Sequence, residues 1–228
     1  MKKTLLAVLL GSFALASFAQ PIMIEKQGAF SAGGTVIEAK KTFDPYHPEP
    51  DAMTLHGDHA NIIYQIPAQA KNVSLMFLHG AGQSMRTWQT TPDGREGFQS
   101  VFLRKGYPVY LIDQPRRGDA GRATVDGTIK ASPDEQFWFG QFRMGLWPKF
   151  YDNSAFASQK DLNSFWRQMT PNTAPYNDKV IADAVTDALK KTKDTVLVTH
   201  SQGCGPGWLI GAEAGKNLKG IIAFEPGS

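Results

Sequence analysis

The stretch of sequence that decides the fold is Thr195-Val-Leu-Val-Thr-His-Ser-Gln-Gly-Cys-Gly205. Its first residues are apolar or β-branched, which predicts a buried strand, and glycines follow Ser201 where a tight turn into a helix is expected. This strand–turn–helix context is that of a nucleophile elbow, a strained turn that exposes a serine Oγ at the end of a sheet. Ser201 is therefore the candidate nucleophile, although Thr199 stands where such elbows usually carry glycine.

Other short apolar runs point to a parallel sheet, because strands covered on both faces lack alternation. They occupy residues 73–78, 107–112 and 220–224. Helical patterns lie between them: residues 98–102 before Gly106, and an apolar stripe over 180–189 after the possible cap Asn177. The alternation predicts an α/β fold with a mostly parallel central sheet and helices on both faces.

The segment before this alternation predicts two early strands, at residues 35–39 and 61–66. We expect them to be antiparallel, with residues 42–58 as a loop and a turn at Gly57-Asp58.

An aromatic-rich insertion precedes the nucleophile strand. More residues separate Ile112 from Thr195 than one crossover helix needs, and residues 137–166 are dense in Phe, Trp and Tyr. We place the insertion at about 123–175. It is either a lid that forms an apolar pocket wall or additional core packing, since aromatic side chains bury well in both roles.

The N-terminus has the layout of a secretory signal peptide. Lys2 and Lys3 precede an uncharged apolar run, and Ser17-Phe-Ala19 provides small residues for cleavage after Ala19. We expect residues 1–19 to be removed, residues 20–228 to form the α/β domain, and the protein to be periplasmic or secreted. The run is too short for a stable membrane anchor.

Composition narrows the possible partners. The chain has 24 basic and 21 acidic residues, and without Lys2 and Lys3 the balance is +1. No basic stripe is present, so nucleic acid is not an expected partner. The single cysteine, Cys204, excludes an internal disulfide and is expected to pack as a small buried residue.

Two further segments complete the candidate site. Leu78-His-Gly-Ala-Gly82 follows a predicted strand, and its backbone can approach a substrate closely. We assign the backbone N–H groups of Ala81 and Gln202 as the oxyanion hole. His79 is expected to orient this loop. Glu225 follows the strand after the nucleophile helix, where a carboxylate can orient a catalytic histidine.

The chain resembles a group of bacterial secreted esterases of the α/β-hydrolase superfamily, the Alcaligenes type. The matching stretches include Thr87-Trp-Gln-Thr-Thr-Pro-Asp-Gly-Arg95, Ile112-Asp-Gln-Pro-Arg-Arg-Gly118 and His200-Ser-Gln-Gly203. The resemblance implies the α/β-hydrolase fold and a Ser–His–Glu triad, with Ser201 as nucleophile and Glu225 as acid. No histidine follows Ser201, so we expect the base and the last strands to lie beyond residue 228, and the fragment alone to be inactive.

The predicted activity is hydrolysis of small-molecule carboxylic esters through an acyl-enzyme, without cofactor or metal. A non-catalytic binding module on the same fold, or a hydrolase of lactones or amides, remains an alternative. The residue types of His47, Asp51, His56, Asp58 and His59 suggest a metal site, but their spacing matches no familiar pattern. Arg116, Arg117 and Arg122 either bind a substrate carboxylate or anchor their loop, and Asp113 is expected to be a structural partner of that loop. The oligomeric state and the identity of the ester stay open.

Overall fold

The computed structural model describes residues 21–156 and 158–227, so the expected signal peptide lies outside the described residues. A six-stranded sheet of order β1-β2-β4-β3-β7-β8 forms the centre. The strands are β1 (Ile24–Ile37), β2 (Leu55–Pro67), β3 (Ser74–Leu78), β4 (Val109–Asp113), β7 (Thr195–His200) and β8 (Leu218–Phe224). β3, β4, β7 and β8 pair in parallel, while β1 and β2 add antiparallel strands at one edge.

Helices cover both faces of this sheet, as predicted. On one face, α4 (Asp178–Lys190) and α5 (Cys204–Glu213) pack against Met76, Ile112 and Leu197. On the other face, α1 (Phe98–Arg104) and the 3-10 turn Met85–Trp88 cover Phe77, Leu111 and their neighbours. The apolar strands β3 and β4 are therefore buried on both sides, whereas β8, at the edge of the sheet, is partly exposed.

The two residues that the sequence suggested as helix ends, Asn177 and Gly106, lie at helix ends in the structure. The side chain of Asn177 accepts a hydrogen bond from the backbone N–H of Val180 and so caps α4. Gly106 adopts a φ of 82° just after α1, a conformation that favours glycine at a helix end.

The early strands are antiparallel, but they are longer than the sequence indicated. Gly57 and Asp58 lie inside β2, where Gly57 pairs with Thr35, so the turn expected there is wrong. The actual connection between the strands contains the 3-10 turn Pro50–Ala52. Most of β1 is exposed, and an exposed strand held by backbone hydrogen bonds carries no apolar alternation that would mark its length.

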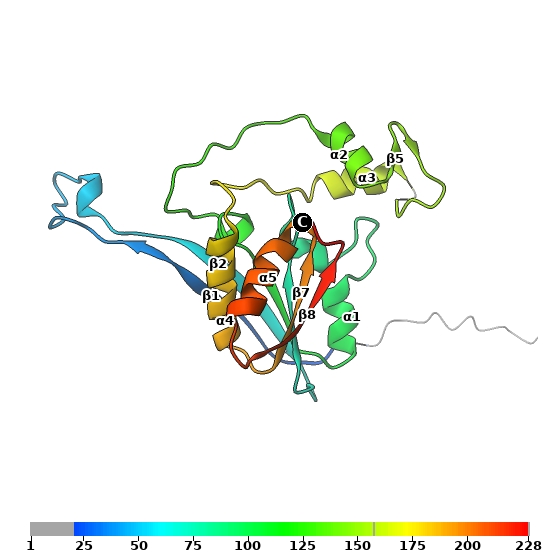
Figure 1. Ribbon diagram of the computed structural model, residues 1–228, viewed down its shortest axis with the longest axis horizontal. Helices are drawn as coiled ribbons and strands as arrows, with labels where there is room; N and C mark the ends of the chain where they lie inside the picture. The colour runs from blue at the N-terminus through cyan, green and yellow to red at the C-terminus, as the bar shows by residue number, and fades with distance from the viewer. Residues whose placement is uncertain (1–20, 157, 228) are drawn as a thin grey trace, which may run out of the picture.

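Residues 121–177 leave the sheet and form a separate structure. It contains α2 (Glu135–Gln141), α3 (Gln159–Trp166) and a small hairpin of β5 (Gly145–Leu146) and β6 (Lys149–Phe150). This segment lies over the end of the sheet where β7 ends (Figure 1). Phe139, Met144 and Leu162 form its own buried cluster with surrounding aromatic side chains.

Candidate active site

Ser201 occupies a strained turn at the end of β7. The strand ends at His200, a 3-10 turn spans Ser201–Gly203, and α5 begins at Cys204. Ser201 has a φ of 50°, in the left-handed region that costs a non-glycine residue about 1–2 kcal/mol. A Cβ at Gly203 would lie 2.5 Å from the carbonyl oxygen of His79, so only glycine fits there. This is the geometry that the elbow motif predicts.

Thr199 is accommodated by a glycine from the following helix. Thr199 is fully buried, and its hydroxyl lies 3.1 Å from the sulfur of Cys204, which is also buried. A Cβ at Gly207 would lie 3.0 Å from the Thr199 methyl carbon. Gly207, in the first turn of α5, thus leaves the space that the side chain of Thr199 needs.

The loop after β3 brings the second candidate donor beside the nucleophile. A Cβ at Gly80 would lie 3.0 Å from the Cβ of Ser201, so this loop and the elbow are in contact. Ala81 and Gln202 line one cavity of about 470 Å³. Within the described residues, neither backbone N–H donates a hydrogen bond to the protein. Both groups are therefore available to a ligand in that cavity.

The same cavity has an aromatic wall from the insertion. Trp138 and Phe142 of the α2 region stack with ring centroids 5.2 Å apart, and Trp166 and Met169 complete this side. Asn172, Gln202 and Arg117 form the polar side. Ser201 is adjacent in sequence to Gln202, just outside the residues that line the cavity.

Glu225 lies in the turn after β8, close to the elbow. The backbone N–H of Gly227 donates to the carbonyl oxygen of Ser201 at 3.2 Å, which ties the two turns together. The Glu225 side chain is exposed and accepts a hydrogen bond of 2.6 Å from Arg143 of the insertion. Arg143 lowers the pKa of this carboxyl group, so Glu225 is ionised at neutral pH.

The two histidines near the site are engaged elsewhere. His79 is fully buried, with Nδ1 3.1 Å from the carbonyl oxygen of Gly80 and Nε2 3.4 Å from the backbone nitrogen of Gln114. Burial lowers its pKa to about 3, so it is neutral. His200 Nδ1 lies 3.3 Å from the side-chain oxygen of Gln83. Among the described residues, neither ring is hydrogen-bonded to Ser201.

Asp113 at the end of β4 and Arg116 in the loop that follows make structural contacts. Asp113 is buried and accepts hydrogen bonds from the backbone N–H groups of Met85 and Asp119. Arg116 forms a bidentate ion pair with Asp58, with N–O distances of 2.7 and 2.9 Å. Asp58 is therefore bound to an arginine, and the described part of the chain brings together no group of three metal-ligating side chains.

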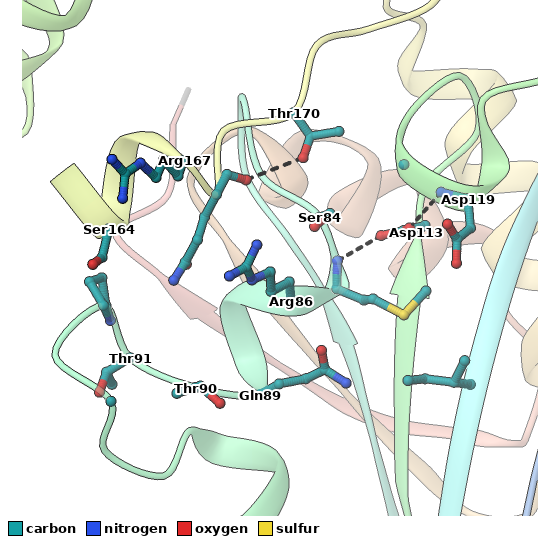
Figure 2. Close-up of a pocket in the computed structure, with 16 residues that line it drawn as sticks. Ser84, Arg86, Gln89, Thr90, Thr91, Asp113, Asp119, Ser164, Arg167 and Thr170 are labelled. Carbon is teal, nitrogen blue, oxygen red and sulfur yellow. Dashed lines mark hydrogen bonds between the residues drawn. The ribbon is translucent and has the colours of Figure 1, made fainter. Parts of the chain in front are cut away.

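A second, polar cleft lies beside the site. It has a volume of about 790 Å³ and is lined by Ser84, Arg86, Thr91, Arg167 and others (Figure 2). Its lining includes Asp113 and Asp119, but neither Ser201 nor the two candidate oxyanion donors. The cavity at Ala81 and Gln202 is thus the one next to the nucleophile.

The structure brings two arginines to the site whose contacts there the sequence does not indicate, Arg117 and Arg143. The sequence offers two roles for Arg117, substrate binding or anchoring of its loop, and nothing in it points to Arg143. Their contacts join segments 37 to 85 residues apart in the chain, so no local spacing could have indicated them.

Comparisons with known proteins agree with this architecture. The model of the alpha/beta hydrolase family matches residues 75–227. A fungal protein (strain ATCC 74256) named probable secreted lipase phiG is 32% identical over 161 residues, which cover 67% of this chain and 44% of that protein. The chain therefore spans less than half of this relative. The solved structure of a bacterial esterase superposes with a TM-score of 0.77 at 28% identity, covering 91% of this chain and 70% of that one.

Proposed function

Because this chain belongs to the alpha/beta hydrolase family, we propose that it carries the nucleophile of a carboxylic ester hydrolase that works through an acyl-enzyme. The fold is the α/β-hydrolase fold, and relatives named as an esterase and a lipase support ester chemistry at this level. The observation that carries the proposal is Ser201 at a φ of 50°, beside a cavity lined by two free backbone N–H groups.

In the proposed reaction, Oγ of Ser201 attacks the ester carbonyl carbon and its proton passes to a histidine base. The N–H groups of Ala81 and Gln202 stabilise the oxyanion of the tetrahedral intermediate. The base then gives the proton to the leaving alcohol, and water releases the acid from the acyl-enzyme. Glu225 orients and stabilises that histidine. We propose that the histidine belongs to a part of the whole protein beyond residue 228.

We propose that the insertion over residues 123–175 acts as a lid that selects the substrate. Trp138, Phe142 and Trp166 give the cavity an apolar wall, which supports esters with an apolar or aromatic acyl or alcohol group. The contact between Arg143 and Glu225 joins this insertion to the turn after β8.

We also propose that the protein is one of the bacterial secreted esterases that its motifs resemble. A relative named as secreted supports export. Within residues 21–156 and 158–227, no helix combines the length and apolar character needed to cross a membrane. The signal peptide and the periplasmic or secreted location belong to this proposal.

The test is covalent labelling of the full-length protein with a serine-directed fluorophosphonate. The wild type should gain one adduct on the peptide that contains Ser201, and Ser201→Ala should lose both the adduct and ester turnover. Ser84→Ala is the matched control, because Ser84 lies in the neighbouring polar cleft and should leave labelling unchanged. An adduct that persists in Ser201→Ala would place the reactive nucleophile at another residue and contradict the assignment, whereas a wild type that gains no adduct would favour a binding role.

A further inference from the structure

Arg117 is almost completely buried between three segments of the site. Its exposed fraction is 2%, and its guanidinium makes four hydrogen bonds. Nη1 donates to the carbonyl oxygen of Gly80 at 2.7 Å. Nε and Nη2 donate to the side-chain oxygen of Asn172, and Nη2 also donates to that of Gln202 at 3.3 Å. One cation thus holds the oxyanion loop, the residue after the nucleophile and the end of the insertion.

The bond to Gly80 acts on the proposed oxyanion donor itself. The carbonyl of Gly80 and the N–H of Ala81 belong to the same planar peptide group, and in a trans peptide they point in opposite directions. Holding the oxygen on the Arg117 side therefore directs the N–H away from Arg117. A charged donor on the carbonyl also polarises the peptide, which makes its N–H a stronger donor.

The second donor is supported in a parallel way. The N–H of Gln202 shares a peptide with the carbonyl of Ser201, which accepts a hydrogen bond from Gly227. Arg117 restrains the side chain of the same residue. Each donor peptide is therefore held through its carbonyl oxygen, which points away from its N–H group.

The contacts argue against a substrate carboxylate as the partner of Arg117. The oxygens of Gly80, Asn172 and Gln202 accept four hydrogen bonds from the five N–H groups of the guanidinium, and the side chain has almost no exposed surface. Burial lowers its pKa to about 10, which still leaves the group charged at neutral pH.

We propose that Arg117 is a positioning residue that holds and polarises the backbone donors of the oxyanion hole. This inference rests on the proposed esterase function. It assigns to Arg117 a role in stabilising the transition state and none in binding the ground-state ester.

The test compares Arg117→Lys and Arg117→Met with Arg116→Lys in the full-length protein, using a neutral p-nitrophenyl ester. Arg116 is the matched control because it is the neighbouring buried arginine, paired with Asp58. We expect Arg117→Met to lower kcat by about 10–100-fold with KM changed less than about twofold, as loss of oxyanion stabilisation does. The kcat of Arg117→Lys should lie between those of the wild type and Arg117→Met, because an ammonium group can donate to Gly80 but cannot reproduce the several N–H donors of a guanidinium.

A second readout separates positioning from general loosening of the structure. An alkyl boronic acid, which forms a tetrahedral adduct with the serine, should bind more weakly to the Arg117 variants in proportion to the loss in kcat/KM. Arg116→Lys should keep both kcat and boronic acid affinity while losing thermal stability. If Arg117→Met does not fold, kcat and boronic acid affinity are compared between Arg117→Lys and the wild type.

Two results would overturn the inference. One is a raised KM with unchanged kcat in the Arg117 variants. The other is an Arg117→Lys protein whose kcat is reduced but whose affinity for the boronic acid equals that of the wild type. Failure of the proposed function looks different. In that case the wild type itself would show no labelling of Ser201, whereas failure of the Arg117 inference leaves the labelling intact.

Discussion

At the scale of single residues, the elbow combines backbone strain with a compensating glycine. Ser201 holds a φ of 50°, and the turn persists because Gly203 fits against the carbonyl of His79. Thr199 adds a β-branched side chain where a glycine is usual, and Gly207 leaves room for its methyl group. Substitutions at Thr199 and Gly207 are therefore expected to have coupled effects on the free energy of unfolding.

A double-mutant cycle tests this coupling. Gly207→Ala gains helix propensity but places a methyl group 3.0 Å from that of Thr199. Thr199→Ser removes that methyl and retains the hydroxyl near Cys204. We expect Gly207→Ala to be less favourable by about 1 kcal/mol with Thr199 than with Ser at 199, measured by urea unfolding. Equal effects in the two backgrounds would show that the two positions are independent.

At the scale of elements, an ion pair joins β2 to the loop after β4 and to both ends of the insertion. Asp58 of β2 binds Arg116 and the hydroxyl of Thr124, and Arg116 also donates to the carbonyl of Pro175. Asp58 is 3% exposed, so the pair is shielded from water. Its hydrogen bonds with Arg116 lower the pKa of Asp58 to about 2.

The sign of the resulting pH dependence follows from that lowered pKa. A carboxyl group with a folded pKa near 2 and an unfolded pKa of about 3.9 stabilises the fold above pH 4 by roughly 2–3 kcal/mol. This stabilisation is lost as the pH falls toward 2, and roughly half of it is gone by pH 3. The difference in unfolding free energy between wild type and Asp58→Asn should therefore shrink from pH 7 to pH 3. A constant difference would mean that Asp58 has an ordinary pKa.

At the scale of the whole molecule, the insertion has its own core above the sheet (Figure 1). Phe139, Met144 and Leu162 are buried with one another, whereas the two larger clusters are centred on the sheet. A region with a separate small core can open locally without unfolding the rest.

A pair of matched truncations tests this independence. Leu162→Ala should destabilise the insertion by about 2–5 kcal/mol and speed proteolytic cleavage between residues 121 and 177, with little change in the midpoint of global unfolding. Leu197→Ala removes an equally buried leucine from β7 and should lower the global midpoint. Equal losses of global stability in both variants would indicate a single cooperative unit.

The sequence by itself determined the features that depend on residues close together in the chain. The apolar runs predicted β3, β4, β7 and β8, the stripe over 180–189 predicted α4 with its Asn177 cap, and the glycines around Ser201 predicted the elbow. Such signals are readable because burial on both faces, helical periodicity and turn sterics act within a few residues. They predicted an α/β fold with a mostly parallel sheet, and the resemblance to secreted esterases implied the α/β-hydrolase fold.

Only the tertiary structure decided which side chains meet across long stretches of chain. The sequence suggested a turn at Gly57-Asp58, but both residues lie inside β2, where Gly57 pairs with Thr35 of β1 and the side chain of Asp58 binds Arg116. Among the three arginines of its loop, Arg117 is distinguished only by its contacts with Gly80, Asn172 and Gln202. A side chain's partners and dielectric surroundings are set by the packing of distant segments, and one-dimensional patterns do not contain that information.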